Sequence, residues 1–143
     1  MSDKSRLQRT TQWLRDRHFH YCPIQFRKDP DAAGIYQKVE YWNSWAGKSI
    51  DLYGIGDILV TQVTPTPNTL LIQVTGDDLE AHLTKYENEP TMLQVWLLAT
   101  NRFQIHTWKK KSKGRWNKDP IIMNAGLTKS GAVCFFEHAK SEA

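Results

Sequence analysis

Two short stretches of the chain combine acidic and amide side chains with strand-forming residues. The first, DLYGIGDILV, brings Asp57 to the start of an apolar strand, and the second, LLIQVT, contains Gln73 and Thr75. Side chains alternate along a strand, so Gln73 and Thr75 share one face and Val74 points the other way. If the two strands pair as a hairpin, Asp57 and Gln73 converge at one end of the sheet. A carboxylate, an amide oxygen and the Val74 carbonyl are hard ligands suited to Mg²⁺ or Mn²⁺.

Other charged residues lie where they could complete such a site. Glu40 lies in a predicted neighbouring strand, and Asp51 lies on the approach to Asp57, so each could add negative charge. Lys85, on the polar side of a predicted helix, or Lys48 could stabilise a transferring phosphate. A single acid–base residue contributes only roughly 10²–10⁴-fold to a reaction rate. Hydrolysis of a phosphate ester therefore requires a divalent ion beside these side chains.

Each candidate residue also has a purely structural interpretation. An Asp that follows glycine is common in turns, as at Asp57. An amide inside an apolar strand, as at Gln73, needs hydrogen-bond partners whether or not it binds a metal. Glu40 and Lys85 fit the solvent-facing sides of a strand and of an amphipathic helix.

A basic segment follows in the second half of the chain. The stretch 109–118, KKKSKGRWNK, contains no acidic residue. Basic clusters supply the salt-sensitive part of binding to a phosphate backbone, and Trp116 within this cluster could stack on a base. A solvated basic loop is the simpler alternative. The predicted nucleic-acid-binding residues are Lys48, Lys109, Lys110, Lys111, Lys113, Arg115 and Trp116.

The elements that must position these residues follow from periodicity and turn residues. Residues 3–17 predict a basic helix with a narrow apolar stripe, and residues 18–34, with two prolines, predict a loop or irregular strand. Strands are predicted at 35–42, 52–63 and 70–75. The proline-rich segment 64–68, TPTPN, favours a turn, so the second and third strands are expected to form a hairpin.

The second half begins with a predicted helix from Gly76-Asp77-Asp78 to Glu89-Pro90, with Leu79, Leu83 and Tyr86 on its buried face. The nearly continuous apolar run 91–99 predicts a strand covered on both faces. Residues 103–109 predict a half-exposed strand, and residues 132–136 favour another. The predicted order is α-β-β-β-α-β-β, an α/β fold with a central mixed β-sheet flanked by helices.

Length and composition favour a single domain spanning residues 1–143. A chain of 143 residues with 40% hydrophobic and 24% charged residues is typical of a globular protein. No apolar run approaches the roughly 20 residues of a membrane helix, and the N-terminus lacks an apolar signal region. Cys22 and Cys134 match no CxxC spacing, so a reduced, cytoplasmic protein is expected. His18, His20 and Cys22 alternate as in a zinc site, but no fourth ligand has a usual spacing.

Several motifs occur in an order that resembles the PD-(D/E)xK nuclease superfamily, and specifically small phage- or prophage-type members. These motifs span roughly Tyr36 to Trp116. They are Val39-Glu40-Tyr41-Trp42-Asn43, Asp51-Leu52-Tyr53-Gly54-Ile55-Gly56-Asp57, Gln73-Val74-Thr75, and Trp108 with Arg115-Trp116.

The resemblance implies a restriction-endonuclease-like core and metal-dependent cleavage of nucleic acid, with DNA as the expected substrate and a homodimer as a common arrangement. In that family an acid and a lysine follow the first Asp on the next strand. Here Gln73 stands at the acid position and Thr75 at the lysine position. A neutral amide binds metal less strongly than a carboxylate, and threonine offers no cation. The alternative is therefore a degenerate nuclease fold that binds nucleic acid or a protein partner without cleavage; an accessory or inhibitor protein with no nucleic-acid role is a third.

Overall fold

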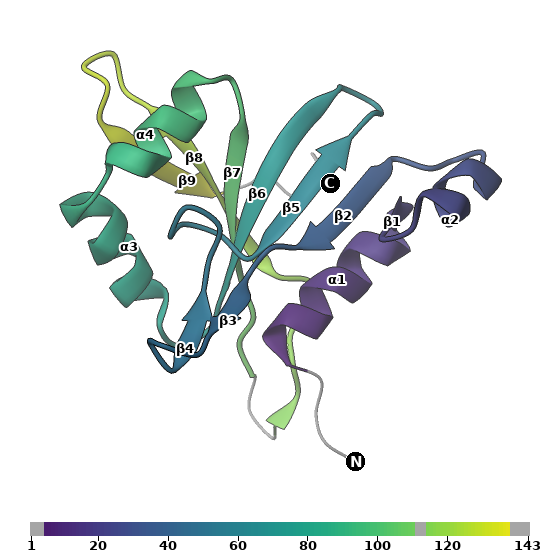
Figure 1. The fold of residues 1–143 in the computed structure, drawn as a ribbon, viewed down its shortest axis with the longest axis horizontal. Helices are drawn as coiled ribbons and strands as arrows, with labels where there is room; N and C mark the ends of the chain where they lie inside the picture. Colours follow the sequence, from purple (N-terminus) through teal and green to yellow (C-terminus); the bar gives the residue numbers. More distant parts are fainter. Residues whose placement is uncertain (1–4, 111–113, 138–143) are drawn as a thin grey trace.

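The computed structural model describes residues 5–110 and 114–137, and in this part of the chain one seven-stranded mixed sheet separates two pairs of helices (Figure 1). The strand order is β1-β2-β5-β6-β7-β8-β9. The strands are β1 (Phe19–His20), β2 (Gly34–Lys38), β5 (Ile58–Gln62), β6 (Asn68–Thr75), β7 (Arg102–Thr107), β8 (Ile121–Leu127) and β9 (Val133–Glu137). The helices are α1 (Arg6–Asp16), α2 (Pro23–Lys28), α3 (Leu79–Asn88) and α4 (Thr91–Leu98). The predicted α/β class, a central mixed sheet flanked by helices, is confirmed.

The connections explain why the sheet is mixed. Strands β5 and β6 form the predicted antiparallel hairpin, with Ile58 opposite Ile72. Strands β6 and β7 are parallel, and a parallel pair needs a crossover connection. Helices α3 and α4 together form this crossover.

The two faces of the sheet bury separate apolar cores. Alternation along β6 sends Leu70 and Ile72 to one face and Leu71 to the other. The first core includes Leu14 of α1, and the second includes Tyr86 of α3 and Leu93 of α4. Gln73, two residues after Leu71, therefore lies on the face that α3 covers.

Helix α1 begins at a capping box. The Ser5 hydroxyl accepts a hydrogen bond from the Gln8 backbone amide, and the Gln8 side chain accepts one from the Ser5 amide. Thr10 is buried and accepts a 2.7 Å hydrogen bond from the Trp108 indole nitrogen. This contact fixes α1 against the segment that leaves β7.

The predicted strand at 91–99 is wrong, because these residues form α4. Methionine, leucine and glutamine favour helix, and Pro90 occupies the cap position before the first turn. Leu93 is buried, whereas Met92, Val95 and Leu98 are exposed. The apolar run is therefore covered on one face only, and near-continuous hydrophobicity does not distinguish such a helix from a buried strand.

Other predicted elements also need correction. The strand predicted at 35–42 is divided into β2 and a separate strand β3 (Tyr41–Asn43), which pairs only with β4 (Lys48–Ile50). Of the strand predicted at 52–63, only Ile58–Gln62 is strand, because a turn occupies the segment before it. The region 18–34 contains β1 and α2, and β8 was not predicted. Strand β7 is buried along most of its length instead of half-exposed, because β6 and β8 flank it and helices cover it.

The strand predicted at 132–136 corresponds to β9, at the edge of the sheet. In the described part of the chain, no helix is long and apolar enough to cross a bilayer.

Candidate metal centre and nucleic-acid interface

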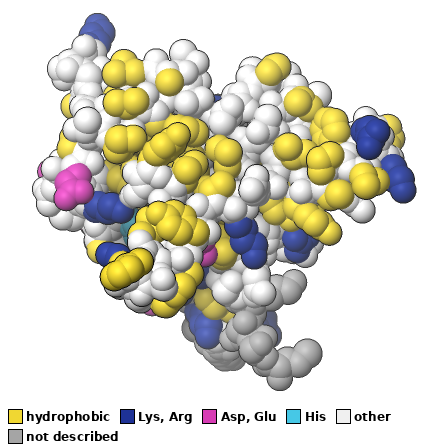
Figure 2. Space-filling model, in the orientation of Figure 1, with side chains coloured by type: hydrophobic (Ala, Val, Ile, Leu, Met, Phe, Trp, Pro, Cys, Tyr) yellow, Lys and Arg dark blue, Asp and Glu magenta, His cyan; other side chains and the backbone are white. Residues whose placement is uncertain are grey.

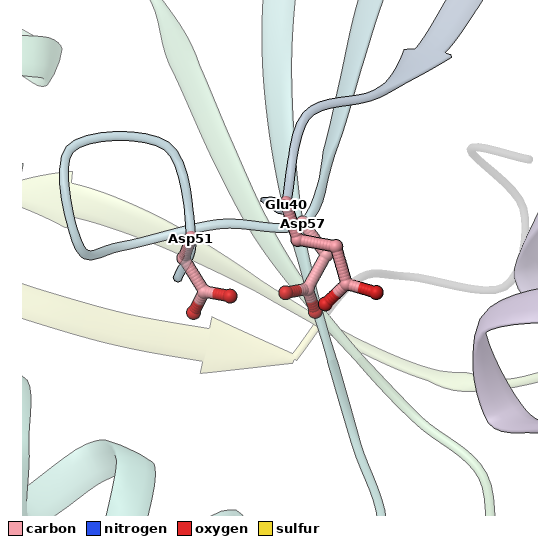
Figure 3. A group of neighbouring side chains, drawn as sticks. All are labelled: Glu40, Asp51 and Asp57. Carbon is pink, nitrogen blue, oxygen red and sulfur yellow. The ribbon is translucent and has the colours of Figure 1, made fainter. Parts of the chain in front are cut away.

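Three carboxylates meet at one end of the sheet. One oxygen each of Glu40, Asp51 and Asp57 lies within 4.8 Å of the others. Glu40 follows β2, Asp51 follows β4 and Asp57 precedes β5, so three separate segments supply the group. Figure 3 shows the three side chains projecting to the same side of the backbone segments that carry them. Among the residues described, this is the one group of three His, Cys, Asp or Glu residues with the spacing of a metal site.

Backbone hydrogen bonds hold the three carboxylates together. The Asp57 amide donates to the Ile72 carbonyl at 2.8 Å, and the Asp57 carbonyl accepts from the Val39 amide at 2.8 Å. The second bond fixes the end of β2 and hence the position of Glu40. Gly56 is required here, because a Cβ at this position would collide with the Leu71 side chain. The strands predicted at 35–42 and 52–63 are thus interrupted at Glu40 and before Ile58, and these interruptions bring the acids together.

A tight turn between Asp51 and Asp57 sets the distance between these two acids. The Leu52 amide donates to the Gly56 carbonyl at 2.9 Å, which closes the loop. Gly54 has φ +72° and Tyr53 has φ +54°, so the chain passes twice through the left-handed region. Glycine adopts that region without steric cost. The turn therefore depends on Gly54, the first glycine of the DLYGIGD motif.

Asp57 is buried and hydrogen-bonded. Its side chain is only 6% exposed, and one carboxylate oxygen accepts bonds from the Gln73 amide nitrogen at 2.8 Å and the Val74 backbone amide at 3.0 Å. Burial, followed by a hydrogen bond with Asp51, raises the pKa of Asp57 to about 9, although the Val74 bond opposes this shift. Repulsion from the Asp51 and Glu40 charges adds to the rise in the pKa. A divalent cation would relieve each of these penalties.

Gln73 is placed beside Asp57 as predicted, but its amide nitrogen, not its oxygen, faces the carboxylate. The same nitrogen donates to the Val74 carbonyl at 3.2 Å. The Gln73 oxygen lies 3.3 Å from the Tyr86 hydroxyl, which also donates to the Ile55 carbonyl at 2.8 Å. Burial, then the Asp51 and Asp57 charges, raises the pKa of Tyr86. In this geometry neither the Gln73 oxygen nor the Val74 carbonyl is free to bind a metal.

Tyr86 is a residue whose role the sequence did not indicate. The i, i+4, i+7 spacing on α3 correctly predicts that Tyr86 is buried, and it is 1% exposed. Its hydroxyl reaches both the turn before Asp57 and the Gln73 amide, and nothing in the helical pattern points to these contacts. A tyrosine, rather than phenylalanine, on a face predicted to be buried was the only available signal.

Thr75, at the position where the resemblance would place a lysine, and Lys85, the predicted substitute, lie in different surroundings. Thr75 is buried, and its hydroxyl lies 2.9 Å from that of Thr107, so it faces a neighbouring strand. Lys85 is exposed and donates a 2.6 Å hydrogen bond to the Gly54 carbonyl. Lys85 thus reaches the turn that carries Asp57, where it contacts backbone. Lys48 is exposed on β4, opposite Asn43.

The basic residues of α1 and of the segment after β7 gather around one indole ring. The charged groups of Arg6, Arg9 and Lys110 lie 5.1, 4.1 and 5.2 Å from the centre of the Trp116 ring. We call these three cations and Trp116 the basic cluster. The Trp116 ring is therefore occupied by cations, as in cation–π contacts, and not open on both faces. Lys109 and Arg115 are exposed nearby in the sequence; the predicted residues Lys111 and Lys113 lie outside the described residues.

The basic cluster and the carboxylates belong to the same end of the sheet. The Trp108 amide donates to the Thr75 carbonyl at 3.0 Å, and the Arg6 guanidinium donates to the Trp108 carbonyl at 3.0 Å. Arg6 is thus joined to the end of β6, two residues beyond Gln73. Figure 2 shows Lys and Arg side chains at the end of the molecule where α1 begins in Figure 1.

The zinc alternative fails on geometry. His18 and His20 both bind one oxygen of Asp29, at 3.0 and 2.8 Å, which lowers the pKa of that carboxyl to about 2. Cys22 and Cys134 are free thiols. The two histidines therefore form a hydrogen-bonded clamp on Asp29 rather than part of a set of three ligands with metal spacing.

Comparison with known proteins finds no relative of this chain. No protein-family model, no curated protein and no solved structure matches the chain. The resemblance to PD-(D/E)xK nucleases consequently depends on the motif residues of this sequence. The function has to be argued from the carboxylates, the basic cluster and their surroundings.

Proposed function

We propose that the protein is a metal-dependent nuclease that hydrolyses phosphodiester bonds, with DNA as the expected substrate. The observation that supports this proposal best is the convergence of Glu40, Asp51 and Asp57 within 4.8 Å at the sheet end that also carries the basic cluster. A metal site and a phosphate-binding surface at the same end of the sheet are what phosphodiester hydrolysis requires.

The three carboxylates fit Mg²⁺ or Mn²⁺ in donor type. Both ions prefer hard oxygen ligands, and Mg²⁺ is commonly held by one or two carboxylates with water completing its shell. Asp57 would be the principal ligand, with Glu40 and Asp51 adding charge. When bound, the ion would lower the pKa of a coordinated water and neutralise phosphate charge.

Gln73 could join this ligand set by turning its amide. Rotation of the amide would aim its oxygen at the carboxylates and its nitrogen at Tyr86. The Tyr86 hydroxyl donates its one hydrogen to Ile55 at 2.8 Å, so its oxygen can accept a bond from that nitrogen. Tyr86 therefore supports either orientation, and the Val74 carbonyl, released from Gln73, would become a free oxygen ligand.

The cations would hold the substrate. Arg6, Arg9 and Lys110 together offer sequence-independent attraction for a phosphate backbone. Lys85 is held at the turn by the Gly54 carbonyl and would exchange this neutral partner for a phosphate oxygen. No lysine stands at the Thr75 position, so Lys85 would have to supply that positive charge.

Cleavage assays with labelled single-stranded and duplex DNA test this proposal. The purified protein should cleave DNA in Mg²⁺ or Mn²⁺ and not in EDTA, and Asp57→Asn should abolish cleavage. Asp31→Asn is a matched control, because Asp31 is exposed on the segment between α2 and β2. Equal activity of wild type and Asp57→Asn would disprove the assignment.

A specific observation also favours the second candidate, a nuclease fold that binds nucleic acid without cutting it. The Gln73 amide donates to Asp57 and to the Val74 carbonyl, and the Thr75 hydroxyl is paired with that of Thr107, so both positions have structural partners. In that case, binding would be salt-sensitive and no divalent ion would give cleavage. Binding by both wild type and Asp57→Asn with no product in any ion would support it.

A further inference from the structure

The hairpin formed by β3 and β4 exposes three aromatic side chains, and the base of this hairpin adjoins the carboxylates. Tyr41, Trp42 and Trp45 are 58%, 66% and 99% exposed. Tryptophan is highly buried on average, so a tryptophan that is almost wholly exposed indicates a surface that binds something. Figure 2 shows hydrophobic groups at the place where β3 and β4 lie in Figure 1.

The hairpin is attached to the candidate metal centre at both ends. Glu40 immediately precedes β3, and Asp51 immediately follows β4. These two carboxylates converge with Asp57. A ligand that runs along the hairpin from its tip to its base would consequently reach the acids. Tyr53, 59% exposed in the turn between Asp51 and Asp57, adds a further exposed ring on the other side of Asp51.

The aromatic side chains of the hairpin do not form one flat patch. Neighbouring residues on a strand point to opposite faces, so Tyr41 and Trp42 project from opposite sides of the hairpin. Trp45 lies in the turn between the strands. The two strands pair only with each other among the described strands, so neither has a hydrogen-bonded strand on its outer edge. A flat protein surface could cover only one face of the hairpin. Aromatic side chains exposed on both faces and at the tip are better suited to insertion between separate planar groups, such as unpaired bases.

We propose that this hairpin stacks on unpaired bases and makes single-stranded nucleic acid, or the unpaired part of a branched one, the substrate class. The inference rests on the proposed nuclease function and specifies its substrate. Every base has a face on which an indole can stack, so recognition would be largely independent of sequence. Lys48, exposed on β4 of the same hairpin, supplies a cation for the adjoining phosphate.

Binding measured without cleavage separates the contribution of the hairpin from that of the metal centre. In EDTA, fluorescence anisotropy would compare a labelled single-stranded oligonucleotide, a blunt duplex and a three-way junction of equal length. Trp45→Ala should weaken single-strand binding by about 5- to 150-fold, the range that loss of one stacked base gives. Trp45→Phe should recover much of that loss, and binding of the blunt duplex should change little.

Matched variants keep the test interpretable. Trp45 is 99% exposed, so its removal leaves the core intact, and circular dichroism would verify the fold. Tyr21→Ala removes another exposed aromatic ring, 69% exposed beside β1, and should leave single-strand affinity unchanged. Trp42→Ala tests the hairpin face independently of its tip.

The outcomes separate this inference from the proposed function. Unchanged single-strand affinity in both Trp42→Ala and Trp45→Ala would overturn the hairpin inference even if the wild type cleaves DNA. Weakened affinity in these variants, with no cleavage by the wild type, would sustain base binding and reject the nuclease. A dimer by sedimentation that dissociates in Trp45→Ala, with unchanged DNA affinity, would show that the hairpin contacts a second copy instead.

Discussion

The amide nitrogen of Gln73 lies 2.8 Å from a carboxylate oxygen of Asp57, and this hydrogen bond joins the two strands at the candidate metal centre. The bond gives a buried acid a neutral partner at the position where the PD-(D/E)xK pattern has a second acid. Because the surroundings raise the pKa of Asp57 to about 9, the metal-free protein holds a proton here at neutral pH. The proton and a divalent cation therefore compete for one carboxyl group.

Asp57→Asn should remove a pH dependence of stability. In the unfolded chain the pKa of Asp57 is near 3.8, and in the folded chain it is about 9. Between these values the folded state binds the proton more tightly, so the free energy of unfolding falls as pH rises, at most about 1.4 kcal/mol per unit. The side-chain oxygen of the introduced asparagine can accept the Gln73 and Val74 bonds without titrating. Metal-free urea denaturation at pH 5 and pH 8 should show a smaller loss in the variant; parallel losses would contradict the raised pKa.

Gln73→Glu should strengthen metal binding and lower the free energy of unfolding of the metal-free protein. The new carboxylate adds charge beside Asp57 and removes the amide donor, so we expect a loss of roughly 1–3 kcal/mol without metal. With saturating Mg²⁺, the thermal midpoint should recover or exceed that of the wild type. Gln25→Glu, on exposed α2, is the control. A metal-free stability equal to the wild type, with no gain in Mg²⁺ affinity, would count against this geometry.

Tyr86→Phe should lower stability through two lost contacts. The hydroxyl serves the Ile55 carbonyl and the Gln73 amide in a site that is 1% exposed, so the variant leaves buried polar groups unpaired. We expect a loss of about 1–3 kcal/mol in the free energy of unfolding by urea denaturation. Mg²⁺ affinity should also fall, because the turned Gln73 amide would lack its acceptor. Wild-type stability and affinity in Tyr86→Phe would show that the hydroxyl does not organise the site.

Arg9→Ala should reduce the salt dependence of DNA binding. The Arg9 guanidinium lies 4.1 Å from the Trp116 ring centre in the basic cluster. Loss of one phosphate contact lowers the slope of log affinity against log salt by about 0.7–0.9. Arg27→Ala on α2, which removes an exposed arginine, should leave the slope unchanged. If both variants behave alike, the effect comes from net charge and not from a defined interface.

Local sequence patterns were sufficient to predict the elements whose defining contacts join residues that are close together in the sequence. The amphipathic α1, the β5–β6 hairpin around the proline-rich turn and the buried face of α3 all follow from spacing and turn residues. Helix α4 was mistaken for a strand because a nearly continuous apolar run lacks a period that separates the two. Its helix-favouring residues and the Pro90 cap agree with the helix that the structure shows.

The site divides in the same way. Placing Asp57 beside Gln73 needed only the hairpin register. Glu40 and Asp51 were put forward as additional carboxylates, and their oxygens lie near that of Asp57. The direction of the Gln73 amide could not be predicted, because the two acceptors of its nitrogen, Asp57 and the Val74 carbonyl, decide it. The approach of the α1 arginines to the indole ring of the basic cluster likewise depends on an anchor between α1 and the segment after β7, which lies far away in the sequence.

Calorimetric titration of Mg²⁺ and Mn²⁺ into the wild type and Asp57→Asn tests the central claim most directly. We expect saturable binding to the wild type, stronger at pH 8 than at pH 6 because the metal must displace the Asp57 proton, with proton release detectable in buffers of different ionisation heat. Asp57→Asn should lose this binding while it stays folded. Absence of binding in the wild type, with or without a short DNA, or equal binding in the two proteins, would contradict a metal centre at Glu40, Asp51 and Asp57.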